Sequence, residues 1–411
     1  MWSIKHAALA ASASLCALAA CHNDSGDFGE TNVLPDYLKG QARLTATYDG
    51  VSDDLLTAGL GKSGLGSATP PAAATPTSPT AAELRKIAIY NNYRALVDIS
   101  PNGGYGVLYG PNIDINGGNT LGEGKVAGDE TLVFADDGSG QQNVTLMVQV
   151  PATFSITAPC IVTATSSGSR GIYGAIATAG EWGLKHGCAV AYTDKGTGNG
   201  AHDLAANMVN DIQGVRTSAA TLGKGSQFTA NLSAADLAAY NGAFPNRWAW
   251  KHAHSQQNPE ATWGRDTLRA VEFAFWLLNE KFAILRDGAK FKNPNLSPDR
   301  VIVIASSVSN GAGAAIAALE QDTGGLIDGV AVGEPQLFMN PPSGVTIKRG
   351  STTITGGGKT LYDYFTIANL FEPCASLAAA EADAAGIAAV KPNATTAANR
   401  CQSLKIGRAH V

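Results

Sequence analysis

The sequence has 411 residues, enough for one large domain with attached segments, since single hydrophobic cores stop growing at about 250–300 residues. Charged residues make up only 15% of the chain, against about 25% in an average soluble domain, and the formal net charge is −5 at pH 7. Neither a basic run nor a basic-aromatic stripe occurs in the sequence. The composition therefore excludes a protein that binds nucleic acid through phosphate contacts.

The first twenty residues resemble a bacterial export signal. Lys5 and His6 give a basic start, an apolar run follows, and small residues precede Cys21. The run is too short to span a bilayer as a permanent helix. Because Leu-Ala-Ala-Cys at 18–21 resembles a lipobox, we expect residues 1–20 to be a signal peptide of the lipoprotein type and Cys21 to be lipidated. An ordinary secretory signal is the alternative.

Export has consequences for location and for the cysteines. We expect a protein of a Gram-negative bacterium that is secreted or is a periplasmic or outer-membrane lipoprotein, with membrane contact only through the N-terminal anchor. An oxidising compartment permits disulfides between Cys160, Cys188, Cys374 and Cys401. Cys160 and Cys188 each open a predicted strand, and these strands are expected to be neighbours. We therefore predict the pairs Cys160–Cys188 and Cys374–Cys401, with four buried free thiols as the alternative.

Beyond the signal, the composition of residues 21–81 indicates a polar tether and a linker rich in Pro, Ala, Thr and Ser. Apolar residues at helical spacing predict a helix over 82–97. Alternating runs at 130–135 and 143–151 enclose a turn cluster and indicate a β-hairpin. Short apolar runs and helical patterns then alternate. They predict strands at 160–165, 188–193, 301–305 and 327–332, and helices at 174–186, 262–282 and 312–321.

A hairpin followed by alternating strands and helices implies a mostly parallel sheet with helices on both faces. The expected fold class is α/β, of the α/β-hydrolase-like type, with a partial catalytic domain at 82–405. A long segment at about 196–260 interrupts the alternation. It is predicted to be a lid or a substrate-facing insertion, although its aromatic residues can equally pack a small core of their own.

Ser309 is the strongest candidate for chemistry. The apolar strand at 301–305 leads to a turn at Ser309 and then into an Ala-rich helix, which is the setting of a nucleophile elbow. The positive end of that helix would lie under the serine oxygen. The usual pattern has glycine two residues before the serine, whereas Ser307 stands there; serine is small enough to fit. The alternative is a serine with only a structural role in the turn.

A second loop of small residues follows the strand at 160–165. The expected fold places an oxyanion donor there, so we assign Gly168, Ser169 and Arg170 to that role through their backbone N–H groups. The N–H of Asn310, the residue after the nucleophile, would be the other donor. Ser169 is also the competing candidate nucleophile. The alternative for the loop is a tight glycine turn without a catalytic role.

A serine nucleophile requires a base and an orienting carboxylate, and in the expected fold both follow the serine. The only histidine after Ser309 is His410. It lies in the tail at 406–411, which resembles the translation of a sequencing-adaptor read and which we interpret as non-native. We therefore expect a chain truncated before its last strands and before its base. Glu334 could be the acid, or a salt-bridged surface residue.

Two histidines upstream form an H-x-H pair, His252 and His254. Such a pair can bind a metal ion, but a third ligand at a supportive spacing is missing, so no metal site is predicted. With Trp248, these histidines are assigned to the neighbourhood of the substrate cleft. The Gly-rich run at 194–200 lacks the glycine spacing of a dinucleotide site and is interpreted as a flexible strand exit.

Four longer runs resemble the bacterial D-3-hydroxybutyrate oligomer hydrolases: Tyr48–Gly61, Ala164–Gly171, Ala253–Glu260 and Ser307–Gly311. The likeness extends over most of the chain. It implies that Ser309 is the charge-relay serine and that the substrates are 3-hydroxybutyrate oligomers from polyhydroxybutyrate degradation. It also implies acyl transfer through a 3-hydroxybutyryl ester of Ser309, without a metal or an organic cofactor.

Other functions stay open at this point. One is a general or feruloyl-type esterase, which differs from a 3-hydroxybutyrate oligomer hydrolase only in its substrate. Another is a catalytically silent lipoprotein that binds oligomers. Because the base is expected to be missing, we predict silence for the 411-residue chain and catalysis for the complete gene product.

Overall fold

The structure is a computed structural model that describes residues 29–100, 102–141, 143–337, 346–354 and isolated residues between 365 and 402. The predicted signal at 1–20, Cys21 and the tail at 406–411 with His410 lie outside the described residues. The chain divides into two units, Met1–Gln336 and Leu337–Val411. In the second unit, β14 (Ile347–Arg349) and β15 (Thr352–Ile354) form an antiparallel ribbon.

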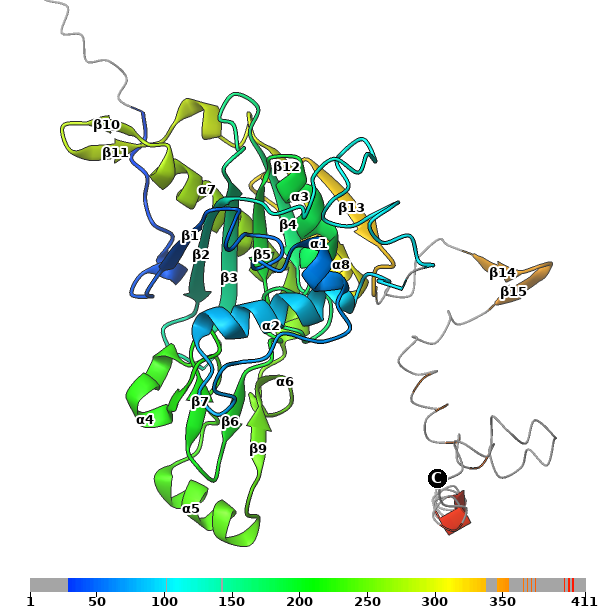
Figure 1. Cartoon of the computed structure of the whole chain (residues 1–411). Helices are drawn as coiled ribbons and strands as arrows, with labels where there is room; N and C mark the ends of the chain where they lie inside the picture. Colours follow the sequence, from blue (N-terminus) through cyan, green and yellow to red (C-terminus); the bar gives the residue numbers. More distant parts are fainter. Residues whose placement is uncertain are drawn as a thin grey trace, which may run out of the picture. The chain divides into compact units, whose positions relative to one another are not determined.

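A seven-stranded sheet in the order β1-β2-β3-β5-β4-β12-β13 forms the centre of the first unit (Figure 1). Its strands are β1 (Leu44–Tyr48), β2 (Gly128–Ala135), β3 (Val144–Pro151), β4 (Cys160–Thr165), β5 (Ala189–Thr193), β12 (Ile302–Val308) and β13 (Gly329–Gly333). The pairs from β1 to β5 are antiparallel. The pairs from β5 to β13 are parallel. The sheet is therefore mixed.

The predicted α/β-hydrolase-like class with a mostly parallel sheet is wrong. Half of the neighbouring pairs in the sheet are antiparallel, because β3 pairs with both β2 and β5 and because β1 adds a further antiparallel strand. The fold is α/β, with helices packed on a β-sheet that contains both parallel and antiparallel strands. The expectation that final strands are missing depended on that fold class and falls with it.

Helices cover both faces of this sheet, and Figure 1 shows α7 and α2 on opposite sides of it. One face packs against α7 (Trp263–Lys281) and α8 (Ser309–Gln321). Fully buried residues on this face include Val133, Leu146, Val148, Ile161, Ala191, Phe273, Leu278, Val303 and Ala315. Burial of a side chain such as Phe273 or Leu278 stabilises the fold by about 1.5–3 kcal/mol. Among the described helices, none is long and apolar enough to cross a membrane.

The opposite face packs against α1 (Gly61–Gly66), α2 (Ala81–Arg94), α3 (Glu181–Lys185) and the π-helical turn Ile176–Gly180. Adjacent strand residues point to opposite faces, so Leu132 joins this core while Val133 joins the other. The start of α2 is fixed by a capping box between Thr80 and Glu83. This helix was expected at 82–97 and begins one residue earlier.

Residues before α2 contribute more to the core than a tether and linker at 21–81 would. Leu38, Leu55, Leu56 and Leu65 are fully buried, and β1 lies at the edge of the sheet. The contribution of these leucines to the core could not be predicted from composition, because they are separated by polar and small residues. Single turns of 3-10 helix lie at Asp36–Leu38, Gly223–Gly225, Pro259–Thr262 and Pro294–Leu296.

The predicted insertion at 196–260 forms a small antiparallel sheet in the order β8-β7-β6-β9, which Figure 1 shows beyond α2. Its elements are β6 (Ala201–Asp203), β7 (Met208–Asn210), β8 (Arg216–Ser218), α4 (Ala219–Leu222), α5 (Ala234–Ala243), β9 (Trp248–Trp250) and α6 (Lys251–His254). Its small core contains Leu204, Phe228 and Ala249, whereas Trp248 and Trp250 are exposed. After α7, β10 (Ile284–Arg286) and β11 (Ala289–Phe291) form a hairpin.

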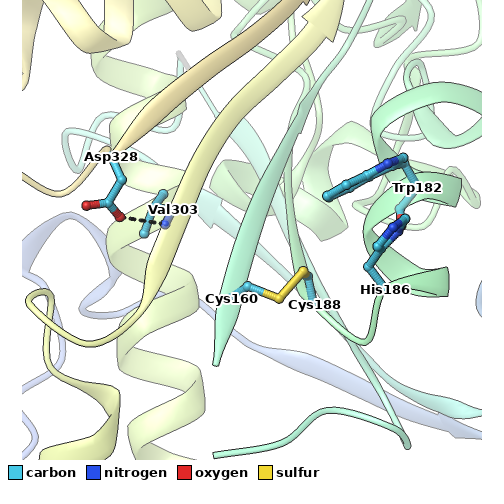
Figure 2. The surroundings of a disulfide bond; sticks show 6 residues. All are labelled: Cys160, Trp182, His186, Cys188, Val303 and Asp328. Atoms are coloured by element: carbon cyan, nitrogen blue, oxygen red, sulfur yellow. Dashed lines mark hydrogen bonds between the residues drawn. A yellow bond between two sulfur atoms is a disulfide. The ribbon is translucent and has the colours of Figure 1, made fainter. Parts of the chain in front are cut away.

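Figure 2 shows the disulfide between Cys160, at the start of β4, and Cys188, just before β5. It joins two neighbouring parallel strands. The rings of Trp182 and His186 stack with their centroids 3.9 Å apart. In the second unit Cys374 is bonded to Cys401. These are the two pairs named from the sequence.

Candidate active site

Ser309 lies where β12 ends and α8 begins. Its backbone φ is 59°. This left-handed conformation is uncommon for a residue with a side chain, and such residues cost about 1–3 kcal/mol and persist only where their surroundings hold them. The residue is exposed, and its hydroxyl takes part in none of the hydrogen bonds among described residues. The turn thus leaves the Ser309 oxygen open to a ligand.

The turn requires small residues on the first part of α8. A Cβ on Gly311 would lie 2.4 Å from Oγ of Ser307 and 2.5 Å from the carbonyl oxygen of Thr165. A Cβ on Gly313 would lie 2.2 Å from the carbonyl oxygen of Gln336. Ser307 is buried, and its hydroxyl donates to the carbonyl oxygen of Thr165 at 2.6 Å. Serine is accommodated at this position because its hydroxyl has a partner.

The loop after β4 is bonded to the start of α8. The backbone N–H of Gly168 donates to Oδ1 of Asn310 at 2.6 Å. The four predicted oxyanion residues therefore lie together beside Ser309, but the N–H of Gly168 is engaged by the protein itself. The backbone N–H groups of Ser169, Arg170 and Asn310 donate to no other described residue. These three N–H groups are the donors that remain for a substrate oxygen.

A buried lysine holds this loop from the inside. Lys195 is fully buried, and its Nζ donates to the carbonyl oxygens of Ser166 at 2.6 Å and Gly168 at 2.9 Å. Burial lowers the pKa of Lys195 to about 7, although the nearby charge of Asp194 partly opposes the shift. Sequence reasoning missed this residue because a lysine in a glycine-rich run looks solvent-exposed. The prediction of a flexible strand exit is wrong for its first residues.

His252 reaches the same loop from the insertion. Its Nδ1 lies 2.8 Å from Oγ of Ser169. His254 instead accepts a hydrogen bond from the backbone N–H of Trp250 at 2.9 Å. Trp248 stacks on Trp250 in β9 and lies under the guanidinium of Arg216. Of the three residues assigned to the cleft, the contacts therefore bring only His252 to the loop beside Ser309. In the described part of the chain, no three His, Cys, Asp or Glu residues are grouped so that they could hold a metal ion.

None of the described histidines is hydrogen-bonded to Ser309. The hydrogen bonds of the described imidazoles go to residues elsewhere, as His186 with Trp182, His202 with Asn207, His252 with Ser169 and His254 with Trp250 show. Glu334 is exposed just beyond β13, whose last residue pairs with Val308 in the sheet. Its φ of 49° is left-handed, as that of Ser309 is. A hydrogen-bonded triad is therefore not assembled by the described residues.

A cavity of about 590 Å³ opens next to the oxyanion loop. It lies among α2, β2 and the insertion, and its charged lining residues are Asp53, Arg85, Glu130, Arg170 and Asp194. Ser309 is not part of the lining. The loop from Gly168 to Gly171 connects the two places, because it contacts α8 at one end and lines the cavity at the other.

Known proteins are similar in sequence to this chain over nearly its whole length. The family of 3HB-oligomer hydrolases matches residues 17–409. The D-(-)-3-hydroxybutyrate oligomer hydrolase of Polaromonas naphthalenivorans (strain CJ2) is 60% identical over 96% of this chain and 55% of its own length. Those of Paraburkholderia xenovorans (strain LB400) and Burkholderia thailandensis are 56% and 58% identical, each over 94% of this chain and 55% of its own length. No solved structure gives a significant match.

The matches define a class first: the relatives are hydrolases. Within that class, the chain belongs to the 3HB-oligomer hydrolase family, which confirms the resemblance of the four sequence runs. The chain spans about half the length of the curated relatives it matches.

Proposed function

We propose that this chain carries the nucleophile, Ser309, of an ester hydrolase that cleaves D-3-hydroxybutyrate oligomers to 3-hydroxybutyrate. The observation that carries the proposal is the exposed Ser309 hydroxyl on a left-handed turn at the start of α8. Strain of this kind is found where a serine is presented to a substrate. Family membership supports the substrate class, because the relatives are named as D-(-)-3-hydroxybutyrate oligomer hydrolases.

The chemistry follows from the groups around Ser309. Its Oγ attacks the ester carbonyl carbon while a base removes the hydroxyl proton, and the carbonyl oxygen becomes an oxyanion. The free N–H groups of Asn310 and Ser169 can donate to that oxygen. The intermediate then expels the alcohol oxygen of the leaving 3-hydroxybutyrate unit, which takes up the proton. Water hydrolyses the acyl ester on Ser309 and releases the second product.

Among the described residues, none is hydrogen-bonded to Ser309 as the base that this scheme needs. We keep the prediction that the 411-residue chain alone is silent, and it rests on the described imidazoles, which bond to residues other than Ser309. His252 is bonded to Ser169, a residue of the oxyanion loop, and is the first residue to test as an alternative base.

Exported location is a further part of the proposal. The two disulfides support it, because such bonds persist mainly in oxidising compartments. Lipidation at Cys21 would give a membrane anchor. Cell fractionation of the wild-type chain and of Cys21→Ser tests this: an anchored lipoprotein moves from the membrane to the soluble fraction in the variant, and an unchanged distribution would argue for an ordinary secreted protein.

Chemical rescue tests the proposed function on the chain as it exists. The linear 3-hydroxybutyrate dimer is incubated with the chain in the presence and absence of added imidazole, which can act as a base in place of a histidine side chain. We expect monomer release only with imidazole. Ser309→Ala abolishes this release, whereas Ser169→Ala, the matched control for the competing serine, retains much of it. Release that survives in Ser309→Ala would disprove the assigned nucleophile.

Activity without imidazole would have a different meaning. It would contradict the prediction of silence and move the base to a residue within this chain. His252→Ala then decides whether that residue is His252. A neutral butyrate ester, measured in parallel, separates a hydroxybutyrate-specific enzyme from a general esterase, because only the general esterase is expected to turn over both substrates equally well.

A further inference from the structure

Arg170 is the cation in the cavity lining that has no carboxylate partner among the described residues. Its Nε donates to the carbonyl oxygen of Ser167 at 2.7 Å, and its Nη2 donates to that of Gly174 at 3.2 Å. A guanidinium has five N–H donors in a planar fork, so the N–H groups of Nη1 and one of Nη2 stay unused by described residues. Partial burial lowers the pKa of Arg170, which means that its charge is desolvated without a compensating acid.

Each carboxylate of the lining forms an ion pair with a cation other than Arg170. Asp53 and Glu130 each lie 3.0 Å from the guanidinium of Arg85. Asp194 lies 3.5 Å from Nζ of Lys251. Because Arg170 takes part in none of these ion pairs, its guanidinium can accept an anion without losing an existing one.

The rest of the wall suits a polyester chain. Amide side chains line the cavity and can donate to ester carbonyl oxygens, while aliphatic side chains offer surface for methyl groups. The amides are Asn199, Asn210, Gln213 and Gln227, and the aliphatic residues include Leu84, Ile172 and Ile212. In a 3-hydroxybutyrate oligomer, ester carbonyl groups alternate with methyl groups along the chain, and one end is a free carboxylate.

The loop that carries Arg170 into the cavity lining is bonded to the residue that follows Ser309. Arg170 is two residues from Gly168, so their Cα atoms are at most about 7.6 Å apart, and the N–H of Gly168 is bonded to Asn310. Ser309 follows β12, the oxyanion loop follows β4 and Asp194 follows β5. These three parallel strands are neighbours in the sheet, so the groups that follow them lie at the same edge.

We infer that the guanidinium of Arg170 binds the free carboxylate of the oligomer in this cavity and so presents the ester nearest the carboxyl end to Ser309. The inference deepens the proposed function and rests on it for the identity of the ligand. Arginine suits the role because its planar fork matches the two oxygens of a carboxylate. The protein would then select oligomer acids over neutral esters of the same length.

Binding measured on Ser309→Ala tests this inference without turnover. Calorimetry compares the dissociation constants of the linear dimer acid and of its methyl ester, which differ only in the charged end. We expect the acid to bind about tenfold or more tightly, as a charge-assisted hydrogen bond allows. Adding Arg170→Gln should bring the ratio of the two constants close to one. Arg170→Lys keeps the charge but loses the fork, and should retain part of the preference.

Several results would overturn the inference. Equal binding of acid and ester by Ser309→Ala would do so, as would absence of binding by both compounds. A preference that survives in Arg170→Gln would do so as well. Arg300→Gln, an exposed arginine that does not line the cavity, is the control for a general change in net charge. If Arg170→Gln does not fold, Arg170→Lys and the ratio in Ser309→Ala itself still decide.

The outcome is separable from that of the proposed function. Hydrolysis with rescue but without acid preference would leave Ser309 as the nucleophile and remove the role of Arg170. Acid preference that depends on Arg170, with no hydrolysis under any condition, would keep the carboxylate site and contradict the catalytic role of this chain.

Discussion

The side-chain oxygen of Asn310 accepts a hydrogen bond of 2.6 Å from the backbone N–H of Gly168. This contact joins the loop after β4 to the helix that begins at Ser309. It sets the distance between the candidate nucleophile and the candidate oxyanion donors, and it uses one of those donors in the process. A substrate oxygen must therefore be met by the N–H groups of neighbouring residues, or must displace Asn310.

Substitution of Asn310 separates these two effects. Asn310→Ala removes the acceptor and should lower the free energy of unfolding by about 1 kcal/mol while it slows imidazole-rescued acylation. Asn310→Asp keeps an acceptor for Gly168 but places a negative charge beside the developing oxyanion. We expect Asn310→Asp to unfold like the wild type and to acylate more slowly still. Denaturant unfolding and rescue rates measure the two quantities, and equally slow acylation by both variants would argue against an oxyanion at this place.

Gly311→Ala should damage the turn itself. The added Cβ would lie 2.4 Å from Oγ of Ser307, and overpacking of this kind typically costs about 1–3 kcal/mol. Gly242→Ala is the matched control, because Gly242 lies in the exposed helix α5 and a Cβ there meets nothing within 4 Å. The control should be neutral or stabilising by no more than about 1 kcal/mol. Urea unfolding of both variants checks the difference, and equal stabilities would mean that the turn is not tightly packed.

The lowered pKa of Lys195 predicts that the free energy of unfolding depends on pH. Its pKa falls from 10.5 to about 7 on folding, so between these values the unfolded chain binds more protons than the folded chain. Stability should therefore rise with pH across this window and fall as the pH drops toward 7. Compared with Lys195→Met, the free energy of unfolding of the wild type should increase by about 2 kcal/mol from pH 7 to pH 9. A difference that stays constant over this range would show that the folded pKa is not lowered.

The disulfide between β4 and β5 should stabilise the fold mainly by restricting the unfolded chain. Cys160 and Cys188 are 28 residues apart, and closing a loop of that length is worth about 3–4 kcal/mol in the chain-entropy treatment. The double variant Cys160→Ala/Cys188→Ala should lose an amount of this order in unfolding experiments. The double variant of Cys374 and Cys401, which removes the second disulfide, is the control. It shows how much of the effect of a reductant on the wild type comes from that other pair. No loss of stability would mean that strand pairing alone holds this region.

The local elements of the site could be predicted from sequence, because their signals lie within one short window. The apolar strand before Ser309, the Ala-rich helix after it and the loop at Gly168 all appear where the pattern places them. The direction of the strands in the sheet could not be predicted in the same way. It depends on the pairing of β3 with β5, residues more than forty positions apart whose side-chain patterns fit either direction.

The burial of polar residues could not be predicted from the sequence either. Lys195 lies in a glycine-rich run, and only the three-dimensional structure shows that its ammonium group meets two loop carbonyls. The four strands of the insertion have three residues each, too few for a period of two to be recognised. The role of the Arg170 side chain depends on which carboxylates are already paired across the cavity, and such pairings join residues far apart in the chain.

Mass spectrometry of the acyl intermediate tests the central claim, that Ser309 is the nucleophile, most directly. The chain is mixed with an activated 3-hydroxybutyrate ester and imidazole, quenched with acid and digested. We predict one 3-hydroxybutyryl group on the peptide that contains Ser309, and no such group in Ser309→Ala. Acylation of Ser169 instead, or an equal extent of acylation in Ser309→Ala, would contradict the assignment.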